Sequence, residues 1–223
     1  MNIVFVLFPN LTQLDFTGPL QVLSRLPDAQ VHLAAASLEP VATDAVMTIN
    51  PTVDFDDCPQ GELLCVPGGF GVDEAMQEGP VLNFVKKQSD KATYVTSVCT
   101  GAFVLGAAGV LKGKRATTHW AYHESLTAFG ATPEKARVVR DGNVFTGGGV
   151  TAGIDFALTL AAEIAGEKFA QSIQLGIEYD PAPPFDAGSA ERAPAAVVSM
   201  IKKFYAMRAE GFEEKLKKAS ENF

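Results

Sequence analysis

The sequence has little of what several classes of protein require. Basic residues are outnumbered, with 18 Lys and Arg against 26 Asp and Glu and a net charge of -8. This balance disfavours a nucleic-acid binder, because phosphate contacts need clustered basic side chains. The roughly 18 consecutive apolar residues that a membrane span needs are found nowhere, and Met1–Asn10 lacks the basic start of a signal peptide. We therefore expect a soluble protein that binds neither nucleic acid nor membrane.

Cysteine is also scarce. Cys58, Cys65 and Cys99 cannot all pair, and none has the C-x-x-C or zinc-ligand spacing. An odd count without a disulfide framework is typical of a reducing compartment. The sequence thus predicts a cytoplasmic protein without a metal site.

What is present is an alternation of apolar strands and helices. Asn2–Phe8 and Glu62–Pro67 are continuous apolar runs, which is typical of strands covered on both faces, and Tyr94–Val98 is rich in β-branched residues. The remaining expected elements are the strands Val31–Ala36 and Arg115–Thr118 and the helices Pro80–Lys91, Ala102–Ala108, Ala121–Phe129, Thr151–Ala165 and Lys168–Glu178. Such alternation predicts an α/β protein with a mostly parallel sheet and helices on both faces.

Four further segments complete this expectation. Val41–Phe55 predicts a short antiparallel excursion, and Val138–Phe145 predicts a hairpin because Asp-Gly interrupts it. A loop is expected over Asn10–Pro19, with Pro19 beginning a helix that ends near Leu26. One amphipathic helix is expected from Ala193 to about Ser220. We expect a single domain over residues 1–223, in which 186–223 form a C-terminal helical extension.

Three segments should meet at the carboxyl edge of the sheet, where doubly wound proteins bind ligands: 8–15, 66–69 and 98–101. Cys99 lies between a buried strand and a helix, which predicts a sharp turn of the nucleophile-elbow kind. At a helix start, backbone N–H groups and the macrodipole would favour its thiolate. From the residue alone, Cys99 is equally compatible with a small buried apolar side chain.

Two neighbouring polar residues have similar alternatives. Asp15 suits the capping of the following helix, although Thr17 lies nearer Pro19 and is the better cap. Thr100 suits a first-turn hydroxyl that satisfies the helix start. The run Gly147–Gly149 precedes a helix but lacks a P-loop lysine, so it predicts close backbone approach to the Cys99 region rather than a phosphate site.

Several motifs together resemble a known family. They are Leu14-Asp-Phe-Thr-Gly-Pro19, Val66-Pro-Gly-Gly69, Ser97 to Leu111, Lys114 to Trp120, Val138 to Asn143, Phe145 to Gly149, Thr151 to Phe156 and Tyr179 to Phe185. In this order they resemble the PfpI-type branch of the class I glutamine amidotransferase-like superfamily, and within it the isocyanide hydratases. The segment after about Ala193 carries little of the resemblance.

The resemblance implies a flavodoxin-like sandwich, a homodimer and a cofactor-independent hydro-lyase acting on a small isocyanide. It implies Cys99 as nucleophile, Asp15 as its acid/base partner and Thr100 near the substrate. Backbone N–H groups of Gly69 and Thr100 would stabilise developing negative charge. The sequence leaves open which of Cys99 and Asp15 holds the proton at rest, and whether the C-terminal helix is exchanged between subunits.

This chemistry suits the residues. The terminal carbon of an isocyanide must accept both a nucleophile and a proton, which a thiolate and an adjacent carboxylic acid would supply. Water would then release an N-substituted formamide. The alternatives are a cysteine-based redox sensor and a glyoxalase-like or hydrolase-like enzyme of the same superfamily. His119 has neither neighbour typical of the peptidase and glutaminase branches, so we expect it to be mainly structural.

Overall fold

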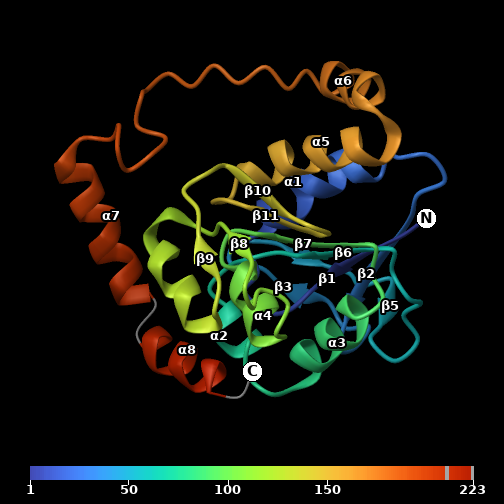
Figure 1. Ribbon diagram of the computed structural model, residues 1–223, viewed down its shortest axis with the longest axis horizontal. Helices are drawn as coiled ribbons and strands as arrows, with labels where there is room; N and C mark the ends of the chain where they lie inside the picture. Colours follow the sequence, from blue (N-terminus) through green and yellow to red (C-terminus); the bar gives the residue numbers. More distant parts are fainter. Residues whose placement is uncertain (209–210, 222–223) are drawn as a thin grey trace.

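A seven-stranded sheet forms the centre of the computed structural model, which describes residues 1–208 and 211–221 (Figure 1). Its strands, in spatial order, are β10 (Val138–Asp141), β11 (Val144–Gly147), β7 (Tyr94–Val98), β6 (Leu63–Val66), β1 (Asn2–Val6), β2 (Gln30–Ala35) and β5 (Val53–Asp54). Neighbours run parallel except for β10 and β11. The expected mostly parallel sheet and the hairpin are therefore confirmed.

Helices cover both faces of this sheet. Figure 1 shows α1 (Gln13–Leu23) and α5 (Ala152–Ala165) on one face, with α6 (Glu167–Gly176) packed outside α5. The other face carries α2 (Val72–Ala75), α3 (Pro80–Ser89), α4 (Gly101–Ala107) and α8 (Phe212–Ser220). This is the α/β sandwich that the alternation of strands and helices predicts.

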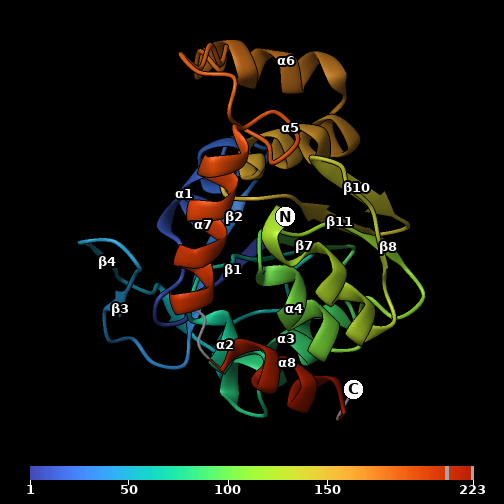
Figure 2. The same ribbon diagram turned by 90° about the vertical axis from the view of Figure 1, so that its left-hand side faces the viewer.

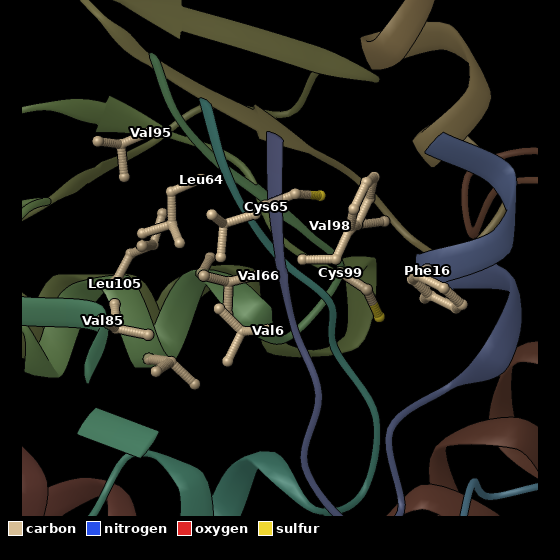
Figure 3. Packing of buried hydrophobic residues seen from close by; sticks show 14 of the residues in the cluster. Val6, Phe16, Leu64, Cys65, Val66, Val85, Val95, Val98, Cys99 and Leu105 are labelled. Atoms are coloured by element: carbon tan, nitrogen blue, oxygen red, sulfur yellow. The ribbon is translucent and has the colours of Figure 1, made fainter. Parts of the chain in front are cut away.

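The hydrophobic core lies between the sheet and the helices on each of its two faces. All four residues of β6 are buried, with Cys65 paired to Phe5 of β1 and Thr96 of β7. Figure 3 shows how Leu64, Cys65 and Val66 lie among apolar side chains of the neighbouring strands and helices. A strand covered on both faces has no polar side, which explains why it is a continuous apolar run in the sequence.

Smaller elements surround the sheet. The expected excursion is an antiparallel pair of β3 (Val41–Ala42) and β4 (Thr48–Ile49), whereas the end of that segment joins the main sheet as β5. The strand expected at 115–118 is a two-residue β8 (Arg115–Ala116) that pairs with β9 (Thr132–Pro133). The helix expected at 121–129 is a 3₁₀ helix, η1 (Trp120–Phe129), with a kink at Tyr122.

The loop expected over Asn10–Pro19 is wrong, because α1 begins at Gln13 and contains Pro19. Thr17 is consequently not the cap; its hydroxyl donates to the carbonyl of Gln13 one turn earlier. Tertiary packing overrides the preference of proline for a helix start. Helix α1 lies against α5 so closely that a Cβ added to Gly153 would be 3.0 Å from the Pro19 ring.

The single C-terminal helix is also wrong. The described residues form α7 (Ala195–Arg208) and α8, and Gly211 before α8 has a left-handed backbone with φ of 80°. Helix α8 buries Phe212, Leu216 and Ala219, whereas α7 has no buried residue. Figure 2 shows α7 crossing the front of the molecule toward α8. No helix among the described residues is both long and apolar enough to cross a bilayer.

Candidate active site

Cys99 lies at the sharp turn between β7 and α4, as the sequence predicts. Its φ of 55° is in the left-handed region, which costs a non-glycine residue about 1 to 3 kcal/mol. Three hydrogen bonds hold this conformation: the Cys99 N–H donates to the carbonyls of Gly147 (3.1 Å) and Gly148 (2.9 Å), and the Cys99 carbonyl accepts from the Thr118 hydroxyl at 2.8 Å. The glycine run therefore approaches the cysteine backbone closely, as expected.

The loop after β6 contacts the start of α4. The Gly69 N–H donates to the Thr100 hydroxyl at 3.0 Å, and this hydroxyl lies 3.2 Å from the Gly69 carbonyl, to which it donates. Thr100 thus caps no helix N–H, and its hydroxyl instead joins two loops. The N–H that the resemblance offers for charge stabilisation at Gly69 is engaged with Thr100 in this structure.

Asp15 reaches the same place from the first turn of α1. Its side chain is fully buried, and Oδ2 accepts a hydrogen bond from the Gly68 N–H at 2.9 Å. Its other oxygen, Oδ1, is buried without a hydrogen-bond partner in the part of the chain that the structure describes. An unpartnered buried carboxylate oxygen is costly for stability and is typical of catalytic groups. Asp15 therefore has a free oxygen beside the cysteine rather than a capping bond.

The pKa values of Asp15 and Cys99 are both raised. Burial raises the pKa of Asp15 from 3.8 to about 7, against the opposing effects of the Gly68 N–H and the Cys99 thiol. Burial and the charge of Asp15 raise the pKa of the Cys99 thiol well above its ordinary range. The expected preference for thiolate is therefore outweighed by burial. The two groups interact and titrate as a pair that holds one proton over a wide range above neutral pH.

Donors nevertheless surround the Cys99 sulfur. The N–H groups of Val150 and Thr100 and the Thr100 hydroxyl each favour its ionised form. Val150 itself has a positive φ of 21°, which is rare for a β-branched residue. The sequence gives no signal for Val150 beyond its place after the glycine run, and its role depends on how the loop after β11 turns.

A cavity of about 200 Å³ opens onto Cys99. Its wall consists of Thr12, Asp44, Gly69, Phe70, Asp73, Thr100, His119, Tyr122, Val150, Phe204, Tyr205, Arg208 and Phe212. Aromatic rings from the loop after β6, from η1 and from both C-terminal helices dominate this list. The cavity suits a small uncharged molecule with an apolar substituent. The sequence does not predict the contribution of α7 and α8.

His119 lies in this wall. Burial lowers the pKa of its ring to about 4, so the ring is neutral at neutral pH. Nδ1 accepts a hydrogen bond from the N–H of Ala121 at 3.3 Å, and Nε2 lies 3.4 Å from the hydroxyl oxygen of Tyr205. The structure thus places in the cavity wall a histidine that we expected to be mainly structural.

The other two cysteines lie away from this cavity. Burial raises the pKa of Cys65 to about 12 within β6 and that of Cys58 to about 11. All three cysteines are free. Among the described residues, no cluster of His, Cys, Asp and Glu could hold a metal ion.

Comparisons with known proteins agree with this architecture. The sequence model of the DJ-1/PfpI family matches residues 1–163. Isonitrile hydratase from Pseudomonas putida is 58% identical over 203 residues, which are 91% of this chain and 89% of that protein.

Two solved structures extend the comparison. The crystal structure of a THiJ/PfpI family protein from Pseudomonas syringae has a TM-score of 0.93 and 42% identity, and the match covers 98% of this chain and 90% of that one. Drosophila melanogaster DJ-1beta has a TM-score of 0.69 and 26% identity, covering 79% of this chain and 97% of that one.

Proposed function

Since the chain belongs to the DJ-1/PfpI family, in which its relative from Pseudomonas putida is an isonitrile hydratase, we propose that it too is an isocyanide hydratase. Isonitrile and isocyanide name the same group, R–N≡C. The observation that carries the proposal is the buried Cys99–Asp15 pair at the end of an aromatic cavity. The reaction adds water to the isocyanide and yields an N-substituted formamide.

The proposed first step uses the one proton that the pair holds. As Sγ of Cys99 gives its proton to the Asp15 carboxylate, it forms a bond to the terminal carbon of the isocyanide, and the same carbon then takes that proton from Asp15. The product is a thioimidate, R–N=CH–S, on Cys99, and Asp15 is left as a carboxylate. The N–H groups of Val150 and Thr100 support the thiolate before it attacks.

The proposed second step is hydrolysis. The Asp15 carboxylate takes a proton from water as the water oxygen bonds to the thioimidate carbon. The second hydrogen of the water ends on the nitrogen, the C–S bond breaks, the formamide leaves, and the pair again holds one proton. Asp15 is suited to both steps because a pKa of about 7 allows it to give and accept a proton near neutral pH.

Incubation with an alkyl isocyanide tests the proposal. Wild-type protein should release the formamide over many turnovers, followed by NMR or chromatography, and Cys99→Ala should release none. Cys65→Ala is the matched control, because it removes a buried thiol outside the cavity and should keep turnover. The absence of formamide with wild type would contradict the hydratase function.

The alternatives predict other outcomes. A redox sensor would form sulfenic or sulfinic acid on Cys99 with peroxide and leave the isocyanide unchanged. The raised pKa and 6% exposure of Cys99 disfavour such oxidation. A glyoxalase-like or hydrolase-like enzyme would turn over dicarbonyl or amide substrates in the same assay.

We further propose a cytoplasmic homodimer. Three free cysteines support the compartment. Helix α7 supports the dimer, because in a single chain it exposes an apolar stripe of Val197, Met200, Phe204 and Met207 at helical spacing. Light scattering in solution should give twice the mass of one chain; the mass of a single chain would contradict the dimer.

A further inference from the structure

A tyrosine from outside the residues that the family model matches reaches the candidate site. Tyr205 belongs to α7, whereas the family match ends at residue 163. It lines the cavity together with Cys99 and Thr100. Its ring meets the His119 ring edge to face, with centroids 5.0 Å apart and an angle of 81°.

The hydrogen bond between these two residues has a defined direction. His119 is neutral, and its Nδ1 accepts the Ala121 N–H, so the ring hydrogen is on Nε2. Nε2 therefore donates to the Tyr205 hydroxyl oxygen, 3.4 Å away. The phenolic hydrogen takes no part in this bond and can point into the cavity. Burial and the charges of Cys99 and Asp15 raise the pKa of Tyr205, which keeps this hydrogen in place at neutral pH.

The proposed hydration needs a donor of this kind. The isocyanide nitrogen carries no hydrogen, yet the formamide nitrogen carries one. During hydrolysis the proton of the Cys99–Asp15 pair has gone to carbon and Asp15 is accepting a proton from water, so a separate donor to nitrogen lets both proton transfers occur in one step. Two other hydroxyls of the wall are engaged: Thr100 donates to Gly69 and Thr12 donates to Asp44.

We propose that the Tyr205 hydroxyl, oriented by His119, is the acid that protonates the nitrogen of the Cys99 thioimidate. The inference rests on the proposed function. As the water oxygen bonds to carbon, the C=N electron pair moves to nitrogen and takes the phenolic hydrogen, while the water gives a proton to Asp15. When the C–S bond breaks, the hydroxyl of the intermediate, R–NH–CH(OH)–S, returns its proton to the Tyr205 oxygen. The leaving thiolate takes the proton from Asp15, so that the Cys99 thiol, the Asp15 carboxylate and the neutral Tyr205 are restored.

Tyr205→Phe tests this step, because it removes one oxygen from a half-buried ring and keeps its packing. Thioimidate formation should be unchanged and its hydrolysis slowed, so kcat and KM should fall together by about 100-fold while kcat/KM changes little. Intact-mass spectrometry should then find Cys99 carrying one added isocyanide mass, which wild type does not accumulate. His119→Phe should accumulate the same adduct.

The controls separate the possible failures. Tyr94→Phe removes a hydroxyl at the start of β7, outside the cavity, and should leave kcat unchanged. Wild-type kcat in Tyr205→Phe without an adduct would overturn the role of Tyr205 and leave the hydratase function intact. A raised KM without an adduct would mean a packing role only and would likewise overturn it.

An adduct in Tyr122→Phe but not in Tyr205→Phe would assign the proton to Tyr122. A wild type that makes no formamide would overturn the proposed function itself.

Discussion

At the scale of a single residue, Asp15 has to meet two opposing requirements. Its burial is unfavourable for the charged form, yet the proposed chemistry needs a carboxyl that exchanges a proton near neutral pH. The fold holds it with one hydrogen bond, from Gly68, and leaves Oδ1 without a partner in the described part of the chain. A capping aspartate would instead have satisfied oxygens and a low pKa. The free oxygen supports the proton-exchanging role that we propose for Asp15.

Asp15→Asn should reduce formamide formation by 10² or more, because the amide cannot transfer a proton at these pKa values. Its effect on stability should depend on pH. The folded-state pKa of about 7 lies above the unfolded value of 3.8, so the folded wild type is relatively most stable below pH 3.8 and loses stability as pH rises through 7. The difference amounts to on the order of 4 kcal/mol. Denaturant unfolding of both proteins between pH 4 and pH 8 measures it.

His119 acts in the opposite direction in both proteins. Its folded pKa of about 4 lies below its ordinary value of 6.5, so it favours the folded state more as pH rises through this interval. The comparison of Asp15→Asn with wild type removes this contribution. A constant difference in unfolding free energy across the pH range would show that Asp15 is not a buried titrating carboxyl. Near-normal turnover of Asp15→Asn would remove Asp15 from the mechanism.

At the scale of elements, the site depends on three strand-to-helix connections that approach one another closely. The loop after β6 touches both other connections at Gly68. A Cβ added there would lie 2.6 Å from the Thr100 nitrogen and 2.7 Å from Asp15 Oδ2. The backbone at the start of α4 is held by close packing and cannot move easily. The added methyl group must therefore displace the Asp15 carboxyl.

Gly68→Ala should therefore lower turnover by at least about 10-fold, since small displacements of reacting groups are costly for rate. The secondary structure by circular dichroism should stay that of wild type. Gly176→Ala is the control, because no heavy atom lies within 4 Å of its added Cβ at the end of α6. Equal turnover in Gly68→Ala and wild type would mean that Asp15 tolerates displacement, contrary to its proposed role.

Some helices and strands could be predicted from sequence patterns alone, and others could not. Strand β7 has the predicted bounds, because a run of β-branched residues between helical segments has few other structures available. Helix α1 starts six residues before the predicted position, since its packing on α5 outweighs the penalty for Pro19 inside a helix. The single predicted C-terminal helix is two, with a left-handed Gly211 before the second.

At the scale of the whole molecule, the C-terminal segment attaches to the sandwich through α8. Leu216 is 4% exposed there, and Lys215 forms ion pairs of 2.6 Å with both Asp73 and Glu74 of α2. Phe212 packs against Phe103 of α4, with ring centroids 5.6 Å apart. Since α8 itself contributes Phe212 to the cavity, its docking positions part of the wall of the site. That residues 186–223 are an extension of a single domain remains our prediction.

Leu216→Ala should weaken this docking by about 2 to 4 kcal/mol, the usual cost of a large-to-small substitution in a packed interior. Hydrogen exchange in α7 and α8 should accelerate, and KM for the isocyanide should rise. Leu175→Ala, at a residue that is 82% exposed in α6, should change stability by less than about 0.5 kcal/mol. If the two variants had equal hydrogen-exchange rates and equal KM, the docking of α8 would not influence the site.

Apolar patterning along the chain is enough to predict the layers of the sandwich and the position of Cys99 at a strand-to-helix turn. Apolar periodicity and strand-to-helix order are local properties, and they suffice for both. The folded arrangement is needed to see which oxygen of Asp15 stays unpaired, that Val150 directs its N–H at the sulfur, and that α7 contributes to the cavity wall. These depend on contacts between residues far apart in the chain, which hydrophobic patterning does not encode.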